Sequence, residues 1–192
     1  MKHYATVLLV ILFNSAIAQT KWNLDKAHTE VKFTATHMMI SEVEGEFKDF
    51  DATVVSTQED FGGSEIEFTA QVASIDTDNE RRDNHLKSDD FFNAEMYPEL
   101  KFKGKLAKEG EEYFLVGDLT MRDVTKAVKF PVKYNGQIPT NRGKKAGFKI
   151  TGTVNRFDYG LKFDRVTEAG GLVVGEDIEI TANIELNEAT EQ

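Results

Sequence analysis

Residues 178–186 read Ile-Glu-Ile-Thr-Ala-Asn-Ile-Glu-Leu, with an apolar residue at every second position. The same alternation occurs in residues 65–72, which read Glu-Ile-Glu-Phe-Thr-Ala-Gln-Val, and it recurs in residues 100–106 and 148–154. Successive side chains of a strand point to opposite faces of a sheet. The period of two therefore predicts strands with one apolar and one solvated face.

Short polar breaks that contain glycine separate these stretches, at residues 60–63, 108–111 and 141–144. Such breaks favour antiparallel connections, because parallel strands would need long helical crossovers. One segment departs from the alternation. Residues 77–80, Thr-Asp-Asn-Glu, have the spacing of a capping box and predict a short helix over residues 80–87, followed by an irregular loop.

About eight one-faced strands can bury their apolar faces as two packed sheets or as one sheet closed into a barrel. A barrel of this size can be packed solid or can hold one ligand, and alternation alone does not choose between these. A membrane barrel would instead turn the apolar face toward lipid. The polar end of the chain, residues 188–192, and aromatic residues in the middle of strands favour an apolar interior.

The composition fits one globular domain and limits the partners. The chain has 192 residues and a net charge of −10, which disfavours binding to nucleic acid and to anionic lipid. It contains no cysteine, so it has neither disulfides nor an N-terminal lipid anchor on cysteine.

The first 18 residues have the pattern of a signal peptide. Lys2 and His3 precede an apolar run at residues 7–13, and residues 16–18, Ala-Ile-Ala, form a cleavage motif. The run is too short to span a bilayer. We therefore expect cleavage after Ala18, one domain over residues 19–192, and a periplasmic or secreted protein without stable membrane insertion.

Motifs for catalysis are missing from the sequence. The mature chain has three histidines, His28, His37 and His85, but no HExxH motif and no GxSxG motif. His28 and His37 could meet across a loop and bind a metal, although a hydrogen bond from His28 to local backbone or to Asp25 is the favoured alternative. We expect no catalytic residue, no metal and no cofactor.

Two polar clusters are candidates for contact with a ligand's head group. Residues 81–85, Arg-Arg-Asp-Asn-His, could line the end of a barrel or form a solvated helix face. In residues 155–160, Arg156 and Asp158 favour bracing of a turn over ligand contact. His37 lies on the inward phase of its strand, where a polar group needs a partner from the protein or from a ligand.

Many separate motifs resemble the YceI-like family of bacterial periplasmic proteins that bind polyisoprenoids and other lipids. The resemblance begins with Trp22-x-Leu24-Asp25-x-x-His28-Thr29-x-Val31-x-Phe33, then His37, and Gly45-Glu46-Phe47. It continues in order through residues 74–77, 79–83, 85–88, 91–92, 97–98, 117–122, 124–126, 155–161 and 174–178. The chain departs from the family pattern at Thr29, Asp89 and Asp123, and none of these changes the apolar phase.

This resemblance implies an extended, lipocalin-like antiparallel barrel with one or two short helices and an elongated apolar interior. It also implies an isoprenoid, isoprenoid-quinone or fatty ligand, and a role in transport, storage or stress response. Because the family has no established catalytic residues, it supplies none here.

The expected ligand-binding residues form two groups. The wall of the interior is predicted to include Phe33, Phe47, Phe68, Phe102, Leu119, Phe130, Phe148, Ile150 and Ile180. The candidates for head-group contact are His37, Arg81, His85 and Arg156. Two other functions stay open at this point: an enzyme with His37 or His85 as acid or base, and a packed barrel that acts through its surface. A homodimer also stays open.

Overall fold

The computed structural model describes residues 19–189, so the predicted signal peptide lies outside the described residues. Within them, no helix has the length and apolar character needed to cross a bilayer. The helical elements are α1 (Glu80–Lys87) and two 3₁₀ turns, η1 (Val72–Ser74) and η2 (Arg156–Tyr159). The strands are β1 (Thr20–Leu24), β2 (Glu30–His37), β3 (Ser41–Phe47), β4 (Phe50–Ser56), β5 (Glu65–Gln71), β6 (Ile75–Asp76), β7 (Glu99–Glu109), β8 (Glu112–Met121), β9 (Val124–Thr140), β10 (Gly143–Asn155) and β11 (Val174–Glu188).

These strand segments form one antiparallel sheet that closes on itself through the pairing of β1 with β11. Three of the eight barrel strands are each broken into two segments. The first consists of β1 and β2, which both pair with β11. The second consists of β4, which pairs with β1, and β3, which pairs with β2. The third consists of β5, which pairs with β4, and β6, which pairs with β3. The predicted antiparallel barrel of about eight strands is therefore confirmed.

The apolar face of the sheet points inward. On β7, Phe102 and Leu106 are buried, whereas Lys101, Lys103 and Lys105 between and beside them are exposed. The same phase holds on the neighbouring strands, where the buried side chains join one hydrophobic core. The interior of the barrel is thus apolar, and the solvated face carries the charges.

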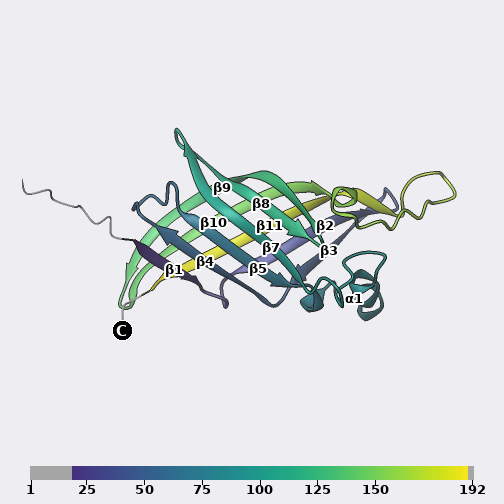
Figure 1. Ribbon diagram of the computed structural model, residues 1–192, viewed down its shortest axis with the longest axis horizontal. Coiled ribbons are helices and arrows are strands. Elements are labelled where there is room, and N and C mark those ends of the chain that lie inside the picture. Colours follow the sequence, from purple (N-terminus) through teal and green to yellow (C-terminus); the bar gives the residue numbers. More distant parts are fainter. Residues whose placement is uncertain (1–18, 190–192) are drawn as a thin grey trace, which may run out of the picture.

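The two ends of the barrel differ in how they are built (Figure 1). At one end, which we call the turn end, lie the connection 57–64, the tight turns after β7 and β9, and the end of β11. At the other, the helix end, lie the turn 38–40, the segment 77–98 with α1, and the loop 160–173. Most of the irregular structure therefore gathers at the helix end.

Helix α1 has the predicted bounds but a different cap. The side chain of Asn79, not Thr77, accepts from the backbone nitrogen of Arg82 at 3.0 Å. Thr77 instead donates its hydroxyl to the buried Asp83 carboxylate at 2.5 Å, and its carbonyl accepts from the Arg82 side chain at 2.6 Å. The expected capping box is therefore wrong in its cap residue, because Thr77 serves to fasten the helix to the preceding strand.

Phe61 closes the turn end. The connection 57–64 folds back into the barrel, and Phe61 is almost completely buried with its backbone in the left-handed region, at φ 62°. Its ring centroid lies 4.8 Å from that of Trp22, 5.0 Å from that of Phe148 and 5.7 Å from that of Tyr134. An aromatic cluster therefore fills this end where the strands stop.

Replacement of Phe61 by Ala should lower the free energy of unfolding by about 3–5 kcal/mol, because it removes a buried ring and leaves a void among three others. Chemical denaturation followed by fluorescence measures this. The matched control is Phe114→Ala on β8, where the ring is half-buried beneath the Lys129 ammonium. Its loss should be about 1 kcal/mol or less. Equal losses in the two variants would contradict a closing role for Phe61.

Candidate ligand-binding site

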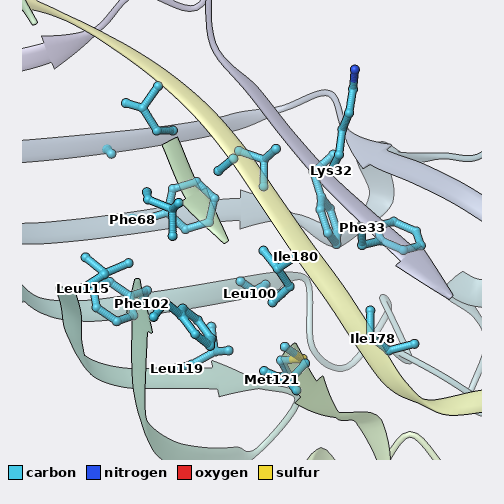
Figure 2. Close-up of a pocket in the computed structure, with 18 of the residues that line it drawn as sticks. Lys32, Phe33, Phe68, Leu100, Phe102, Leu115, Leu119, Met121, Ile178 and Ile180 are labelled. Atoms are coloured by element: carbon cyan, nitrogen blue, oxygen red, sulfur yellow. The ribbon is translucent and has the colours of Figure 1, made fainter. Parts of the chain in front are cut away.

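A cavity of about 220 Å³ lies inside the barrel, and 33 residues line it. All of them except Lys32 and Arg156 are apolar, and Figure 2 shows part of this wall. The space is far larger than the ~10–15 Å³ that one water needs, yet below the ~300–1,000 Å³ of pockets for drug-sized molecules. Water would find almost no hydrogen-bond partner on these walls. The cavity therefore suits a slender apolar chain.

The side chains predicted for the wall all border this cavity, namely Phe33, Phe47, Phe68, Phe102, Leu119, Phe130, Phe148, Ile150 and Ile180. Several of them point inward and are nevertheless only half-buried, as Phe33, Phe68 and Ile180 are. Inward side chains keep accessible surface only where they face open space. Their contact with a ligand stays a prediction.

Glycines on the inner face explain why so many phenylalanines leave the lumen open. Phe130 lies against Gly152 on β10, where a Cβ would stand 2.3 Å from its ring. Phe33 covers Gly45 in the same way, with a closest approach of 2.4 Å. The rings can thus lie flat on the wall, because glycine offers no side chain to hold them away from it. Large residues form a thin lining here.

A third phenylalanine follows this arrangement across a pair of glycines. Gly104 and Gly117 face each other on β7 and β8, and a Cβ on either would meet the Phe102 ring at 2.7–2.8 Å. The rings of Phe102 and Phe33 are both drawn in Figure 2 beside the lumen. Sequence alternation identified these phenylalanines but not the glycines beneath them.

Neither ionisable residue of the wall presents a free charge to the lumen. The Lys32 side chain leads away from the other lining residues (Figure 2), and its ammonium pairs with Glu30 at 2.9 Å. Arg156 is 2% exposed and donates to the carbonyls of Leu161, Val174 and Gly175 at 2.8–3.0 Å. Arg156 therefore braces the chain at the helix end, and burial lowers its pKa.

The other candidates for head-group contact lie away from the lumen. His37 is the last residue of β2 and does not border the cavity, and Arg81 is exposed on α1. The His85 Nε2 lies 2.8 Å from the Asp90 carboxylate, and its ring packs edge-on against Phe91 and Phe163. His85 on α1 thus helps to hold residues 88–98 in place at the helix end. That any of these contacts a ligand stays a prediction.

The barrel wall is interrupted at the helix end. The pairing of β5 with β7 stops at Gln71 and Glu99, and within the described residues β6 pairs with β3 alone. Helix α1 and residues 88–98 fill the gap, and we call this segment the cover. Leu86, Phe91 and Phe92 of the cover border the cavity. Side-chain contacts and loop hydrogen bonds, and no strand ladder, close the lumen here. A second unpaired stretch of the wall lies between β9 and β10, whose pairing stops at Val132 and Ile150.

Arg122, in the turn between β8 and β9, ties this cover to the barrel. Its guanidinium donates to the carbonyl oxygens of Phe91 at 2.9 Å and of Gly160 at 3.0 Å, and it pairs with the Asp89 carboxylate at 3.1 Å. The sequence did not predict this role. A lone arginine in a turn gives no signal of the loops that it joins.

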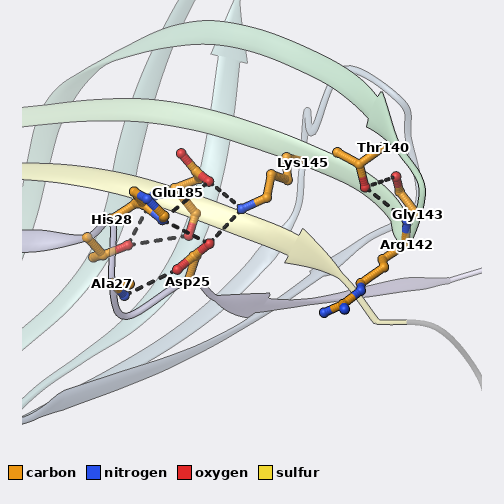
Figure 3. Close-up of polar contacts among 9 residues, drawn as sticks. Asp25, Ala27, His28, Thr140, Arg142, Gly143, Lys145 and Glu185 are labelled. Carbon is orange, nitrogen blue, oxygen red and sulfur yellow. Dashed lines mark hydrogen bonds and ion pairs between the residues drawn. The ribbon is translucent and has the colours of Figure 1, made fainter.

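The break between β1 and β2 is held by a charged cluster on the outer surface (Figure 3). The Lys145 ammonium lies 2.6 Å from the Asp25 carboxylate and 2.5 Å from that of Glu185. His28 Nδ1 is 3.1 Å from Asp25, as the favoured sequence alternative predicted. The ligand atoms of Asp25, His28 and Glu185 lie within 4.8 Å of one another, a spacing that could hold a metal ion. Lys145 already supplies the positive charge between the carboxylates.

A family model of the YceI-like domain matches residues 22–186, nearly the whole of the described barrel. The chain belongs to the YceI-like family. A UPF0312 protein of Staphylococcus epidermidis is 38% identical over 170 residues, which cover 88% of this chain and 98% of that protein. A UPF0312 protein of Staphylococcus aureus is 36% identical with the same coverage.

Solved YceI-like structures share the fold. The Campylobacter jejuni YceI protein is 32% identical, with a TM-score of 0.69 over 88% of this chain and 97% of that one. A domain of Saccharophagus degradans, described as polyisoprenoid-binding, is 11% identical with a TM-score of 0.63, over 88% and 98%. At that identity the likeness shows the fold alone. The predicted membership in the YceI-like family is confirmed.

The first prediction from this site concerns pH. The Lys145 ammonium, which donates to Asp25, holds the pKa of that carboxyl far below its usual value, and His28 adds to the effect. A depressed pKa in the folded state stabilises the fold above the ordinary Asp value of about 4, and this contribution is lost as the pH falls further. The Asp25 side chain is 16% exposed and that of Lys145 is 30% exposed, so solvent screens part of this pair and its contribution to stability is modest.

The substitution Asp25→Asn should therefore lower the melting temperature at neutral pH by about 2–4 °C, the shift that ~1 kcal/mol gives a chain of this size. The difference from wild type should shrink in strong acid, where the wild-type carboxylate also loses its charge. Thermal melts at a series of pH values measure this. The control is Glu67→Gln, which breaks an exposed pair with Lys103 and should change little. A constant gap at all pH values would contradict the prediction.

The second prediction concerns the lumen. In Gly152→Ala the new methyl group would meet the Phe130 ring, which must swing off the wall into the cavity. The affinity for a long prenol such as geranylgeraniol should fall about tenfold, the equivalent of one or two buried methylenes. Fluorescence titration measures the affinity. Gly147→Ala on the same strand is the control, because its methyl group would make only ordinary contact with Asn135. Equal affinities in the two variants would show that ring position does not limit the lumen.

Proposed function

We propose that this protein binds one long apolar chain inside the barrel, of the polyisoprenoid, isoprenoid-quinone or fatty acid and amide type. The observation that carries this proposal is the lumen itself, which a closed barrel of antiparallel strands surrounds and which is lined almost wholly by apolar side chains. Membership in the YceI-like family supports it. So does the description of the Saccharophagus degradans domain, which has the same fold, as polyisoprenoid-binding.

Burial of the tail supplies the affinity. Each methylene moved from water into the lumen gains about 0.8 kcal/mol, so affinity grows with the length of the chain until the lumen is full. Apolar walls discriminate weakly between tails of similar width, so several lipids of this class are acceptable ligands. The polar head remains at an end of the lumen, because the walls offer it no free hydrogen-bonding group.

The chemistry of the wall favours binding over catalysis. Among the residues that border the cavity there is no histidine and no carboxylate. Phe91, Phe163 and Asp90 engage His85, and His37 lies at the end of β2, so neither is placed for acid–base chemistry on a tail in the lumen. The proposed role is therefore carriage or storage of the lipid, including under stress.

We place this role outside the cytoplasm, on the evidence of the signal-peptide pattern in residues 1–18. The mature protein would begin at Gln19 and carry its lipid in the periplasm or after secretion. Purification from the native host, intact-mass measurement and solvent extraction test both parts together. The expected result is a chain that starts at Gln19 with about one long-chain lipid per protein. Repeated recovery of protein without lipid would count against binding.

A series of prenols of increasing length tests the proposal in solution. Trp22 is the single tryptophan of the chain, and it packs against Phe61, which borders the cavity at the turn end. Each added isoprene unit should tighten binding until the chain reaches the turn end, where the emission of Trp22 should change. An affinity that does not depend on length would place the ligand outside the lumen and overturn the proposal.

A further inference from the structure

Exposed apolar side chains gather at one end of the barrel. Among the described residues, six large apolar side chains are exposed, and five of them belong to segments at the helix end. These are Met38, Met39, Ile40, Met96 and Val166, whereas Ile138 lies toward the turn end. An even scatter would need no explanation, but concentration at one end marks a contact surface.

Four of these residues form one projecting surface, which we call the apolar tip: Met38, Met39, Ile40 and Val166. The turn 38–40 is joined to the loop before β11 by a hydrogen bond from Met38 N to Val173 O of 2.8 Å. Met39 also lies against Gly171, where a Cβ would stand 2.0 Å from its sulfur. Figure 1 shows that both segments extend beyond the strands at the helix end.

The backbone conformation of the turn 38–40 is unfavourable for the methionines that occupy it. Met38 and Met39 both adopt the left-handed region, at φ 50° and 65°, which glycine and asparagine tolerate far better than methionine. Polar residues would suit both the turn and the solvent. Local strain combined with exposed apolar side chains indicates that the side chains themselves are used.

The turn of the tip and the segment beside it carry no charge. Residues 38–40 and 169–175 contain no charged side chain, whereas Asp164, Arg165 and Glu168 flank Val166. Depletion of charge is typical of the centre of an interface. The net charge of −10 on the chain would oppose an anionic surface, so the partner that fits is apolar and carries no net negative charge.

We propose that the apolar tip inserts into the surface of a zwitterionic lipid bilayer, where the protein takes up or releases its lipid. This inference rests on the proposed function, because a lipid cargo resides in bilayers and the wall of the barrel is interrupted at this same end. A second protein copy fits less well. Four side chains cannot bury the ~800 Å² per partner of a stable protein interface, whereas shallow insertion into lipid needs only a few.

Flotation with phosphatidylcholine vesicles tests the inference on the full mature chain. Ile40→Ser should lower the fraction bound to vesicles about tenfold, because Ile40 is 86% exposed and loses only its lipid contact. The control Ile138→Ser removes a residue that is 62% exposed toward the opposite end, and should bind as wild type does. No vesicle binding by wild type, or equal loss in both variants, would overturn the inference.

The double variant Met38→Asn, Met39→Gly separates lipid contact from folding. Asparagine and glycine tolerate the left-handed backbone of this turn better than methionine does, so the melting temperature should not fall. Vesicle binding should fall about tenfold, because the apolar side chains are gone. A lower melting temperature with unchanged vesicle binding would mean that the methionines serve the fold, and would overturn the inference.

Prenol binding in the absence of vesicles keeps the two proposals distinguishable. Tip variants should bind geranylgeraniol from a cyclodextrin complex with wild-type affinity, but should extract it from vesicles about tenfold more slowly. If wild type binds no prenol from cyclodextrin, the proposed function fails. If it binds prenol and the tip variants extract it from vesicles as fast as wild type, only the membrane inference fails. Addition of phosphatidylglycerol should weaken vesicle binding, and a strong increase would instead indicate an electrostatic surface.

Discussion

Phenylalanine rings laid flat over glycines are the contact on which the use of this barrel depends. Eight strands enclose a space that side chains can fill, and an interior rich in phenylalanine would ordinarily fill it. Gly152 lets the Phe130 ring rest on the backbone of the neighbouring strand, and Gly45 does the same for Phe33. The wall therefore gains the burial energy of large rings while the centre stays free. An open lumen and a stable core usually compete in a small barrel. Here the glycines keep the lumen open, and the phenylalanine rings supply the burial that stabilises the barrel.

The two ends of the lumen are closed by different kinds of contact, so the two ends of the barrel are not equivalent. At the turn end, Phe61 sits in an aromatic cluster between the ends of the strands, and its displacement would cost a large share of the stability. At the helix end, polar contacts of Arg122 and of His85 with Asp90 hold residues 88–98, together with the buried ring of Phe91. Because no strand ladder joins these residues to the barrel, we expect opening at the helix end to require less free energy than opening at the turn end.

Sequence alternation predicted antiparallel strands with one apolar and one solvated face, because successive side chains of a strand point to opposite faces. The choice of a barrel with an apolar interior came from the resemblance to the YceI-like family, and the barrel is confirmed. Alternation did not predict the breaks at η1 and between β1 and β2, which are set by tertiary pairing. Nor did it identify Lys145 as the partner of Asp25, since nothing local joins residues so far apart in the chain. The cap of α1 was misassigned because Thr77 and Asn79 are both good caps, and only the buried Asp83 decides between them.

Closure of the ladder through β1 and β11 also determines when the chain can finish folding. Trp22 pairs with Glu188, so the first and last strands of the barrel lie side by side. Contacts of such long sequence separation form late and slowly, since the loop that they close spans nearly the whole domain. Until β11 pairs with β1, the apolar faces of the earlier strands stay exposed, and exposed apolar faces with unpaired strand edges favour aggregation.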